Sequence, residues 1–473
     1  MKKITIMLSA LCLAVGIPTT VKAQAPELTL DTTTPDMSEN EPRPVFPVPS
    51  ARQLKWNQTE FYAFFHYGMK GGIAVVKHHD GFCLWPTETT THSVKNAGNQ
   101  FGMDTNIPRD FAKAAQDLGL KYGFYISPWD LSSEWWGIKG DDGFYTDDYA
   151  KKVFLPQCEE IAKYGADQFE MWFDGATGGD HDGYYGGAYG VGKTGKRTID
   201  NANRYYDIPN LRDKIHQMCP NIILWGVGGE ARWIGNESGW AGETCWSMGD
   251  GTSGNENAWK WFPGESDAKA TSKGWFYHDG ETCFTAAKMF ATYLKTVGRN
   301  ATLILNFPPN KAGVLPDADV NNLKELGQML KDRLGNDFAR EAGVKIEATE
   351  TRANGATKTY KADNMIDGNI DTYWAAPDGK TSDITITVTL PQEKTLHYVM
   401  MQEYIQLGQR IKGFTIETST DGNNWTRKAS NKRIIPLNGN VENSYDAGTK
   451  AKYVRIKITD SRACPTLHTL SIF

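Results

Sequence analysis

Side chains that could carry out chemistry follow three separate apolar runs of this sequence. His66 ends the first run, His78 and His79 follow the second, and Asp174 follows a third at 169–173. A carboxylate can act as nucleophile or base, and imidazoles can hydrogen-bond to hydroxyl groups. One such residue at the end of a run is most often a turn or capping residue. Three clusters at equivalent positions favour one shared site.

A metal centre is the first alternative for these histidines, because His66, His78 and His79 could meet. Adjacent residues on a regular strand point to opposite faces, so His78 and His79 cannot both face one barrel axis while the strand stays regular. The His-x-His spacing common in barrel metal sites does not occur in the sequence. Imidazoles that hydrogen-bond to sugar hydroxyls fit the pattern better, and we expect no metal.

The elements that must position these residues are strand–helix units between about 55 and 340. Repeated units of this kind build a parallel sheet, and their number predicts an α/β fold, a (β/α) TIM-like barrel. Reactive groups in such barrels lie where strands end and loops begin. The apolar runs are 61–67, 73–76, 122–126, 169–173, 222–225, 275–277 and 302–307, and the helical stretches include 108–118, 149–164 and 318–334.

After residue 336 the pattern changes to short alternating segments without helical periodicity. Segments 384–390, 414–418 and 453–458 alternate, and turns such as 421–424 separate them. This pattern predicts an antiparallel β-sandwich of the jelly-roll type. We therefore expect a signal peptide at 1–23, an N-terminal arm at 24–54, a catalytic barrel at 55–340 and a sandwich at 341–473.

The first 23 residues have the pattern of an export signal. Lys2 and Lys3 precede the apolar run 4–17, and Ala23 provides a small residue for cleavage. The run is too short to remain as a membrane-spanning helix. A lipoprotein site at Cys12 is the weaker alternative, because Leu11 stands where Gly or Ala is usual. We expect an exported bacterial protein, periplasmic or secreted, with no membrane span.

Composition narrows the class of partner. A net charge of −5 gives no reason to expect nucleic acid. The 15 Trp and 20 Tyr residues suit stacking on sugar rings, although large aromatic cores would explain part of them. The cysteines beyond the signal have no CxxC spacing, and we expect mostly buried free thiols although export permits pairing. They are Cys83, Cys158, Cys219, Cys245, Cys283 and Cys464.

Motifs spread over residues 55 to 335 occur in a family-specific order. The most specific are Lys77-His78-His79-Asp80-Gly81-Phe82 and Asn306-Phe307-Pro308-Pro309-Asn310. Others are His66-Tyr67-Gly68, Gly123-Phe124-Tyr125-Ile126-Ser127, Trp172-Phe173-Asp174-Gly175, Arg232-Trp233-Ile234-Gly235-Asn236-Glu237 and Gly274-Trp275-Phe276-Tyr277-His278. Together they resemble the α-L-fucosidases of glycoside hydrolase family 29.

The resemblance implies a retaining exo-hydrolase that removes terminal α-L-fucose through a covalent glycosyl-enzyme. The family nucleophile falls on Asp174. The acid/base, expected about 5–5.5 Å away, falls on Glu237, whose Gly-Asn-Glu segment is similar to that of the α-1,3/1,4-acting subgroup. Glu230 and Glu243 remain alternatives. A retaining glycosidase for another sugar is a further alternative.

The same resemblance implies a fucose pocket without a catalytic cofactor. Trp172 lies two residues before Asp174, so both point to the same side of the strand. Trp275 would lie near the methyl group at C5, where an aromatic wall distinguishes fucose from sugars with a hydroxymethyl group. The expected partners are fucosylated oligosaccharides or glycoconjugates. The expected substrate-binding residues are His66, His78, His79, Tyr125, Trp172 and Trp275.

The first barrel connection departs from the family pattern. Only Met69 and Lys70 separate the expected first strand from the second. A parallel crossover needs a dozen or more residues, whereas two residues suit an antiparallel hairpin. Either the first loop and helix are missing, or this segment folds differently. The alternative function is therefore a weakened or non-catalytic fucose-binding protein.

The last 130 residues contain motifs of a second family. Segments 364–374, 411–425 and 452–456 resemble discoidin-like (F5/8 type C) domains, which serve as family 32 carbohydrate-binding modules. Many of these hold a structural calcium, and Asp367, Asp371 and Thr372 would supply oxygen ligands here. Thr469 stands where a glutamate usually completes that site. A scaffold that no longer binds sugar is the alternative.

Overall fold

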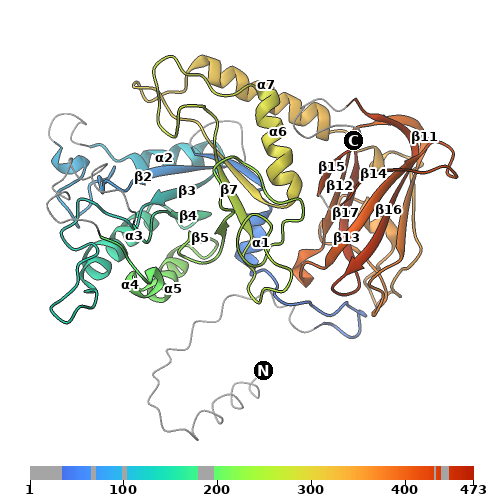
Figure 1. Cartoon of the computed structure of the whole chain (residues 1–473), viewed down its shortest axis with the longest axis horizontal. Helices are drawn as coiled ribbons and strands as arrows, with labels where there is room; N and C mark the ends of the chain where they lie inside the picture. Colours follow the sequence, from blue (N-terminus) through green and yellow to red (C-terminus); the bar gives the residue numbers. More distant parts are fainter. Residues whose placement is uncertain (1–34, 65–70, 98–103, 179–196, 431–432, 438–446) are drawn as a thin grey trace, which may run out of the picture.

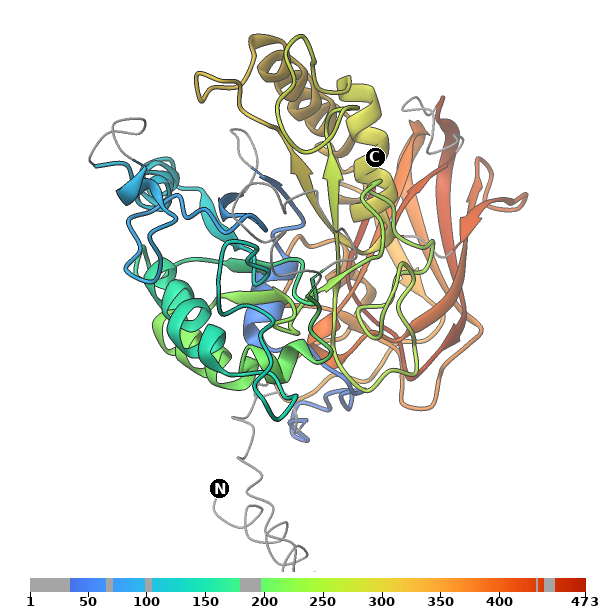
Figure 2. The ribbon, with the colours of Figure 1, turned by 60° about the vertical axis from the view of Figure 1, so that its left-hand side comes forward.

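The computed structural model describes residues 35–64, 71–97, 104–178, 197–430, 433–437 and 447–473. An eight-stranded parallel sheet is followed by two antiparallel sheets (Figure 1). In Figure 2, the helices between β2 and β5 and the sandwich lie on opposite sides of the barrel strands. The predicted TIM-like barrel followed by a β-sandwich is confirmed. The expected signal peptide lies outside the described residues.

The barrel strands pair in the order β5-β4-β3-β2-β1-β8-β7-β6, and every named pair is parallel. An isolated bridge between Trp225 and Ala231 joins β5 to the chain entering β6, so the barrel is nearly closed. The strands are β1 (Phe61–Phe64), β2 (Gly71–Lys77), β3 (Lys121–Ile126), β4 (Glu170–Phe173), β5 (Ile223–Gly226), β6 (Arg232–Trp233), β7 (Gly264–Lys269) and β8 (Thr302–Asn306).

The predicted strand at 275–277 is wrong, because the seventh strand is β7. The interior-facing side chains of β7 are Glu265, Asp267 and Lys269, so the strand carries no apolar pattern. Glu265 accepts a hydrogen bond from Trp172 across the barrel, which places this face inside. A strand that lines a polar interior cannot be found by hydrophobicity.

The amphipathic stretches form the expected outer helices. Asn106 caps α2 by accepting a hydrogen bond from the Arg109 amide, as a helix N-terminus requires. Stretch 149–164 forms a π-helix (Ala150–Phe154) continued by α3. The helices are α1 (Ala51–Asn57), α2 (Ile107–Asp117), α3 (Leu155–Ala162), α4 (Ala202–Tyr205), α5 (Ile208–Met218), α6 (Ala286–Thr296) and α7 (Asp317–Leu334).

The first two strands are parallel neighbours despite their short connection. Ala63 pairs with Gly72 and Phe64 with Ile73 in parallel register. An antiparallel hairpin is therefore excluded. The linking residues 65–70 lie outside the described residues, and six residues are fewer than the ten to twelve or more of a βαβ crossover. Of the two alternatives, a missing first loop and helix fits this pairing.

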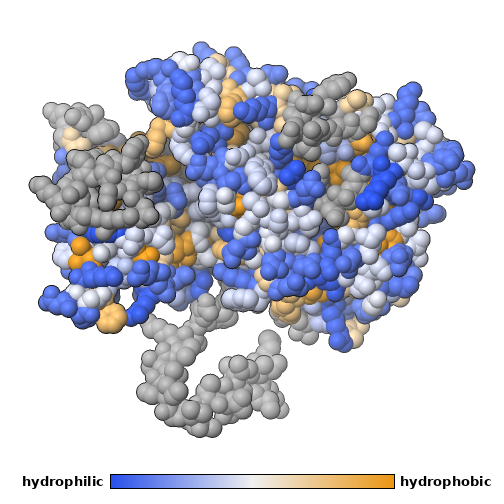
Figure 3. All heavy atoms as spheres, in the orientation of Figure 1, coloured by the Kyte–Doolittle hydropathy of each residue, from blue (hydrophilic) through white to orange (hydrophobic). Residues whose placement is uncertain are grey.

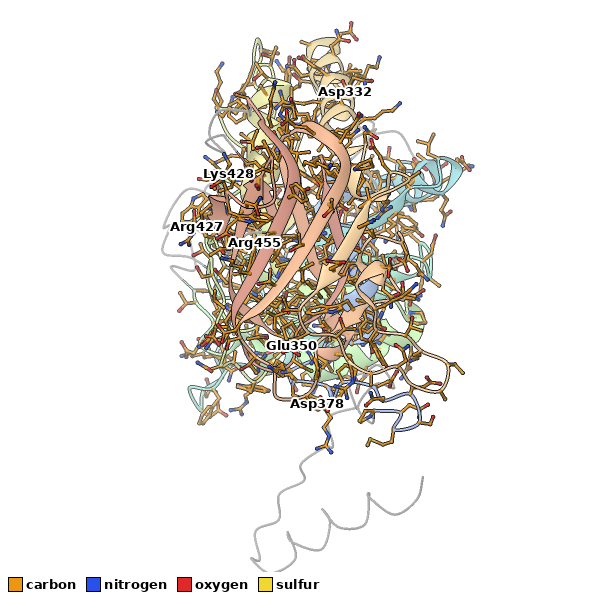
Figure 4. All side chains as sticks on the ribbon, turned by 90° about the vertical axis from the view of Figure 1, so that its right-hand side faces the viewer. Asp332, Glu350, Asp378, Arg427, Lys428 and Arg455 are labelled. Atoms are coloured by element: carbon orange, nitrogen blue, oxygen red, sulfur yellow. The ribbon has the colours of Figure 1, made fainter. Side chains whose placement is uncertain are left out.

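The C-terminal strands form two antiparallel sheets around their own core. Alternate residues of β11 from Ile384 to Leu390 are buried, as expected for a sheet with one covered face. Figure 4 shows Arg427, Lys428 and Arg455 close together on one side of the sandwich. The strands are β9 (Lys345–Ala348), β10 (Trp374–Ala375), β11 (Ile384–Leu396), β12 (Tyr398–Glu403), β13 (Ile411–Ser419), β14 (Thr426–Ser430), β15 (Ile434–Pro436), β16 (Thr449–Ser461) and β17 (Thr466–Ile472).

The barrel and the sandwich share packing. One apolar cluster contains Leu303 and Phe290 of the barrel together with Tyr398 and Phe473 of the sandwich. A cavity of about 390 Å³ also lies along this junction. The segment before α1 contacts the sandwich, because the Tyr360 hydroxyl donates a hydrogen bond to the Glu39 carbonyl at 2.6 Å.

The cysteines and the surface agree with the composition. All six cysteines of the described residues are buried and free, so the expectation of buried thiols is confirmed. Figure 3 shows a mostly hydrophilic face with small, scattered hydrophobic spots. Among the described helices, none is both long and apolar enough to cross a membrane.

Candidate active site

Asp174 lies directly after β4, at the carboxyl end of the barrel strands. Its side chain is 44% exposed. The Tyr125 hydroxyl donates to Asp174 Oδ2 at 3.0 Å, and His79 Nε2 lies 3.6 Å from the same oxygen. Partial burial raises the pKa of Asp174 above its ordinary value, and the Tyr125 hydrogen bond opposes that rise. Two side chains from neighbouring strands therefore orient this carboxylate.

A hydrogen-bonded chain fixes His79. His79 Nδ1 lies 2.7 Å from Ser127 Oγ, which is within bonding distance of the carbonyls of Trp129 and Asp174. Ser127 therefore links the His79 ring to the backbone on both sides of the site and holds its Nε2 beside Asp174.

His78 lies beside His79, with ring centroids 4.1 Å apart. The register of β2 slips between Val75 and Lys77, and the strand ends at Lys77. The alternation of a regular strand therefore does not separate the two imidazoles. Burial lowers the pKa of both histidines to about 4, so they are neutral at pH 7. His66 lies outside the described residues.

Lys77, the first residue of the Lys-His-His-Asp motif, has a structural environment. It is 1% exposed and pairs with Asp130 Oδ2 at 2.8 Å. It also donates to the Tyr149 hydroxyl at 3.0 Å and to Gln157 Oε1 at 2.9 Å. This lysine anchors the end of β2 to the outer layer, directly before the two histidines.

Stacked aromatic rings line the barrel below Asp174. Tyr125 stacks on Trp172 at 5.1 Å, and Trp172 stacks on Trp225 at 3.7 Å. Trp172 Nε1 donates to Glu265 Oε1 at 2.7 Å, which fixes the ring. Trp172 therefore lies on the Asp174 side of β4, as predicted, whereas Trp225 was not predicted from the sequence.

Buried acids form the floor beneath these rings. The Tyr62 hydroxyl lies 2.5 Å from Glu170 Oε2 and also contacts Glu265. Burial raises the pKa of Glu170 and Glu265 well above the ordinary value. A proton on these carboxyls allows two acidic groups to share one phenol in the closed barrel interior.

Glu237 lies in the loop after β6, and its side chain is 44% exposed. Lys269 Nζ on β7 lies 3.0 Å from Glu237 Oε2 and 5.6 Å from the centre of the Trp275 ring. Lys269 shares the interior face of β7 with Glu265, which holds Trp172, so this ion pair keeps Glu237 on the Asp174 side of the barrel. The charge of Glu237 also contributes to the raised pKa of Asp174. Trp275 is partly buried in the same aromatic cluster as Tyr125 and Trp172.

The two alternative carboxyls lie elsewhere. Glu230 is fully buried and contacts Arg52 at 3.4 Å, His216 at 3.1 Å and the Leu224 amide at 2.9 Å. Glu243 lines the cavity between the barrel and the sandwich. Neither of them lies in the cluster around Asp174.

Three further residues near Asp174 were missed by sequence reasoning. Asp267 is 6% exposed, and burial with the charges of Asp174 and Glu237 raises its pKa to about 7. Trp233 Nε1 donates to Asp267 Oδ1 at 2.7 Å. Phe276 is 65% exposed and lies edge-on to His78 at 5.7 Å. The sequence signals that could have revealed these residues were the Arg232-Trp233 motif and the polar side chains of β7.

Most of the chain matches two known protein families. Residues 50–333 match the model of the α-L-fucosidase family, and residues 345–469 match that of the F5/8 type C domain. The chain belongs to the α-L-fucosidase family. It is a glycoside hydrolase with an F5/8 type C domain behind its barrel, and both resemblances inferred from the motifs are confirmed.

Relatives of this fucosidase-family chain cover nearly its whole length. Alpha-L-fucosidase 1 of Arabidopsis thaliana is 27% identical, over 91% of this chain and 88% of the relative. A GH29 fucosidase from Ruminococcus gnavus, solved in complex with fucose, is 28% identical, covers 93% and 97% of the two chains, and superposes with a TM-score of 0.74. A glycoside hydrolase 29 family member from an unknown rumen bacterium is 28% identical, with coverage of 91% and 78% and a TM-score of 0.70.

The expected calcium position of the F5/8 type C domain forms an ordered turn. Thr372 Oγ1 donates to Asp367 Oδ2 at 2.6 Å, and the Asp371 amide donates to Asn369 Oδ1 at 3.0 Å. Within the described ranges, no group of three or more His, Cys, Asp and Glu side chains could hold a metal ion. Thr469 lies on β17, where its hydroxyl contacts His468.

Proposed function

We propose that this enzyme hydrolyses terminal α-L-fucosides with retention of anomeric configuration, with Asp174 as nucleophile and Glu237 as acid/base. The observation that carries the proposal is the convergence of Tyr125 and His79 on one oxygen of Asp174. That convergence orients the carboxylate at the open end of the barrel. The two-carboxyl machinery of retaining glycosidases needs such a group.

In the first step, Asp174 attacks C1 of fucose while protonated Glu237 gives its proton to the glycosidic oxygen. The C1–O bond breaks, the alcohol leaves, and fucosyl-Asp174 forms. In the second step, Glu237 takes a proton from water as the water oxygen attacks C1. The bond from C1 to Asp174 breaks and the configuration at C1 inverts a second time, so the product keeps the α configuration. The two carboxyls supply both steps, and no cofactor enters this scheme.

The pocket proposed for fucose combines neutral imidazoles with aromatic walls. His78 and His79 would bind ring hydroxyls together with His66 and Tyr125. Trp172 and Trp275 would form the walls, with Trp275 toward the C5 methyl group. The complex of the Ruminococcus gnavus relative with fucose supports this sugar. The similarity of the Gly235-Asn236-Glu237 segment to that of the α-1,3/1,4-acting subgroup supports substrates with α-1,3- or α-1,4-linked fucose. The enzyme would degrade such glycans after its export.

The test is turnover of an aryl α-L-fucoside with time-resolved detection of the product anomer. We expect α-fucose first, loss of at least about 10³-fold in kcat for Asp174→Ala, and rescue of Asp174→Ala by azide as a fucosyl azide. Glu237→Gln should lose far more activity on sugar leaving groups than on activated aryl ones. Activity of Asp174→Ala equal to the parent would refute the mechanism, and turnover of an aryl galactoside instead would refute the sugar.

A weakened fucose-binding protein is the second candidate, favoured by the six-residue link between β1 and β2. A crossover of ordinary length between β1 and β2 would border His66 at the catalytic end of the barrel, and its loss would weaken the site. The same aryl assay, on protein of verified intact mass, separates the two. Fucose binding without turnover in the parent protein would select this candidate.

A further inference from the structure

Trp233 has an unusual position for a residue of a barrel strand, because its indole is 45% exposed. Its neighbour Arg232 points outward and donates to the Trp246 carbonyl at 2.9 Å. Successive side chains alternate, so Trp233 points inward. The interior below it is closed, since Glu265 in the paired register is fully buried. The exposed part of the ring therefore opens at the mouth of the barrel.

The ring borders the proposed catalytic carboxyls. Its Nε1 donates to Asp267 Oδ1 at 2.7 Å. Lys269 lies two residues after Asp267 on the same face of β7 and pairs with Glu237 at 3.0 Å, so Glu237 and Asp267 border the same part of the barrel. Glu237 follows Trp233 by only four residues. The open indole face thus lies on the side of the site from which the acid/base approaches.

A hydrogen bond to a buried acid also restrains the ring. Asp267 is 6% exposed, so its position is set by the packed interior. A ring held in place loses little side-chain entropy when a ligand covers it. An exposed, restrained indole with one apolar face suits the C–H face of a pyranose.

Resting on the function proposed above, we propose that Trp233 is the platform for the sugar that carries the fucose. Glu237 must reach the glycosidic oxygen, and the leaving sugar begins at that oxygen. Trp233 would stack on this sugar, and it thereby favours fucosylated oligosaccharides over fucosides with small leaving groups.

The test compares two substrates, a fucosylated trisaccharide and α-L-fucosyl fluoride, whose leaving group contains no sugar. Trp233→Ala should lower the ratio of kcat/KM for trisaccharide over fluoride by about tenfold, the scale of one aromatic contact. Trp233→Phe keeps a ring without the Nε1 donor and should keep most of that ratio. The matched control is Trp259→Ala. Trp259 is 88% exposed five residues before β7 begins, at the opposite end of the barrel, and the ratio should not change.

Three outcomes would overturn the platform. These are an equal loss on both substrates in Trp233→Ala, a Trp233→Phe variant as impaired as Trp233→Ala, and an equal change in Trp259→Ala. Failure of the proposed function is distinct, because the parent would then hydrolyse neither substrate.

A second test measures binding by calorimetry to the Asp174→Ala variant, which does not turn the ligand over. There the trisaccharide should bind tighter than free fucose, and adding Trp233→Ala should remove that difference; an unchanged difference would refute the platform.

Discussion

At the scale of single residues, the site depends on how burial and hydrogen bonds set protonation. Asp174 is half-exposed and its carboxylate is held by Tyr125, whereas His78 and His79 are buried and neutral. Neutral imidazoles can both donate and accept, which suits vicinal hydroxyls better than cations do. The sequence motif predicts these residue types, but their charge states follow from the packing around them.

Tyr125→Phe tests this balance. It removes a hydrogen bond to the charged form of Asp174, so the pKa of Asp174 rises further and the acidic limb of the kcat/KM profile moves to higher pH. We expect a loss of about tenfold in kcat/KM at neutral pH, the value of a hydrogen bond to a charged group. Tyr164→Phe, whose hydroxyl contacts Asn106 instead, is the control. A limb that moves to lower pH would contradict this account.

Glu230→Ala separates structural from catalytic acids. Removing Glu230 leaves the buried Arg52 guanidinium without its partner and should cost about 3 kcal/mol in the free energy of unfolding. Urea denaturation measures this, and Glu243→Ala should cost less than about 1 kcal/mol. The fraction of the Glu230→Ala variant that stays folded should still hydrolyse an aryl fucoside. Loss of turnover at full stability would restore Glu230 as a candidate acid/base.

At the scale of elements, the end of β2 decides where the two histidines lie. Its register slip after Val75 and the buried pair of Lys77 with Asp130 fix the chain before His78. Burial alone would raise the pKa of Asp130, but the Lys77 charge and hydrogen bonds from Lys77 and Ser132 bring it below the ordinary value. The Lys-His-His-Asp motif therefore combines one anchoring residue with two that face the site.

Lys77→Met should destabilise the fold by about 3–5 kcal/mol, because it leaves Asp130 charged and unpaired in the interior. Since the folded-state pKa of Asp130 is lowered, its stabilising effect is present above its unfolded pKa near 3.8 and disappears as pH falls through the folded value. The cost of Lys77→Met, measured by urea denaturation, should thus shrink in strong acid. The exposed Lys163→Met is the control, and a cost independent of pH would contradict the assignment.

At the scale of the whole molecule, the barrel and the sandwich behave as one packed body. Leu303 and Phe290 share an apolar cluster with Tyr398 and Phe473, and the Ser247 amide donates to Gln409 Oε1 at 2.8 Å. The Arg433 guanidinium also pairs with Glu60, directly before β1. The sandwich thus covers apolar surface beside β8 and α6.

Calorimetry tests this coupling. We expect the intact chain to unfold in one transition, and a chain ending at residue 340 to be poorly soluble, because truncation exposes the Leu303 and Phe290 cluster. Tyr398→Ala, which leaves a cavity in the shared cluster, should lower that single Tm. Tyr453→Ala on β16 should lower it less. Two separate transitions in the intact chain, one for each domain, would contradict the shared core.

The sequence by itself determined the barrel, the sandwich, the family and the residue types that follow strands β2 and β4, because hydrophobic periodicity and local motifs are encoded over short distances. It did not reveal β6 and β7, since these strands turn charged and aromatic side chains toward a polar interior. Nor could it choose among Glu230, Glu237 and Glu243, which share one stretch of chain. Only the tertiary structure separated them, because closing the barrel buries Glu230 against Arg52, places Glu243 at the sandwich junction, and pairs Glu237 with Lys269 on the interior face of β7.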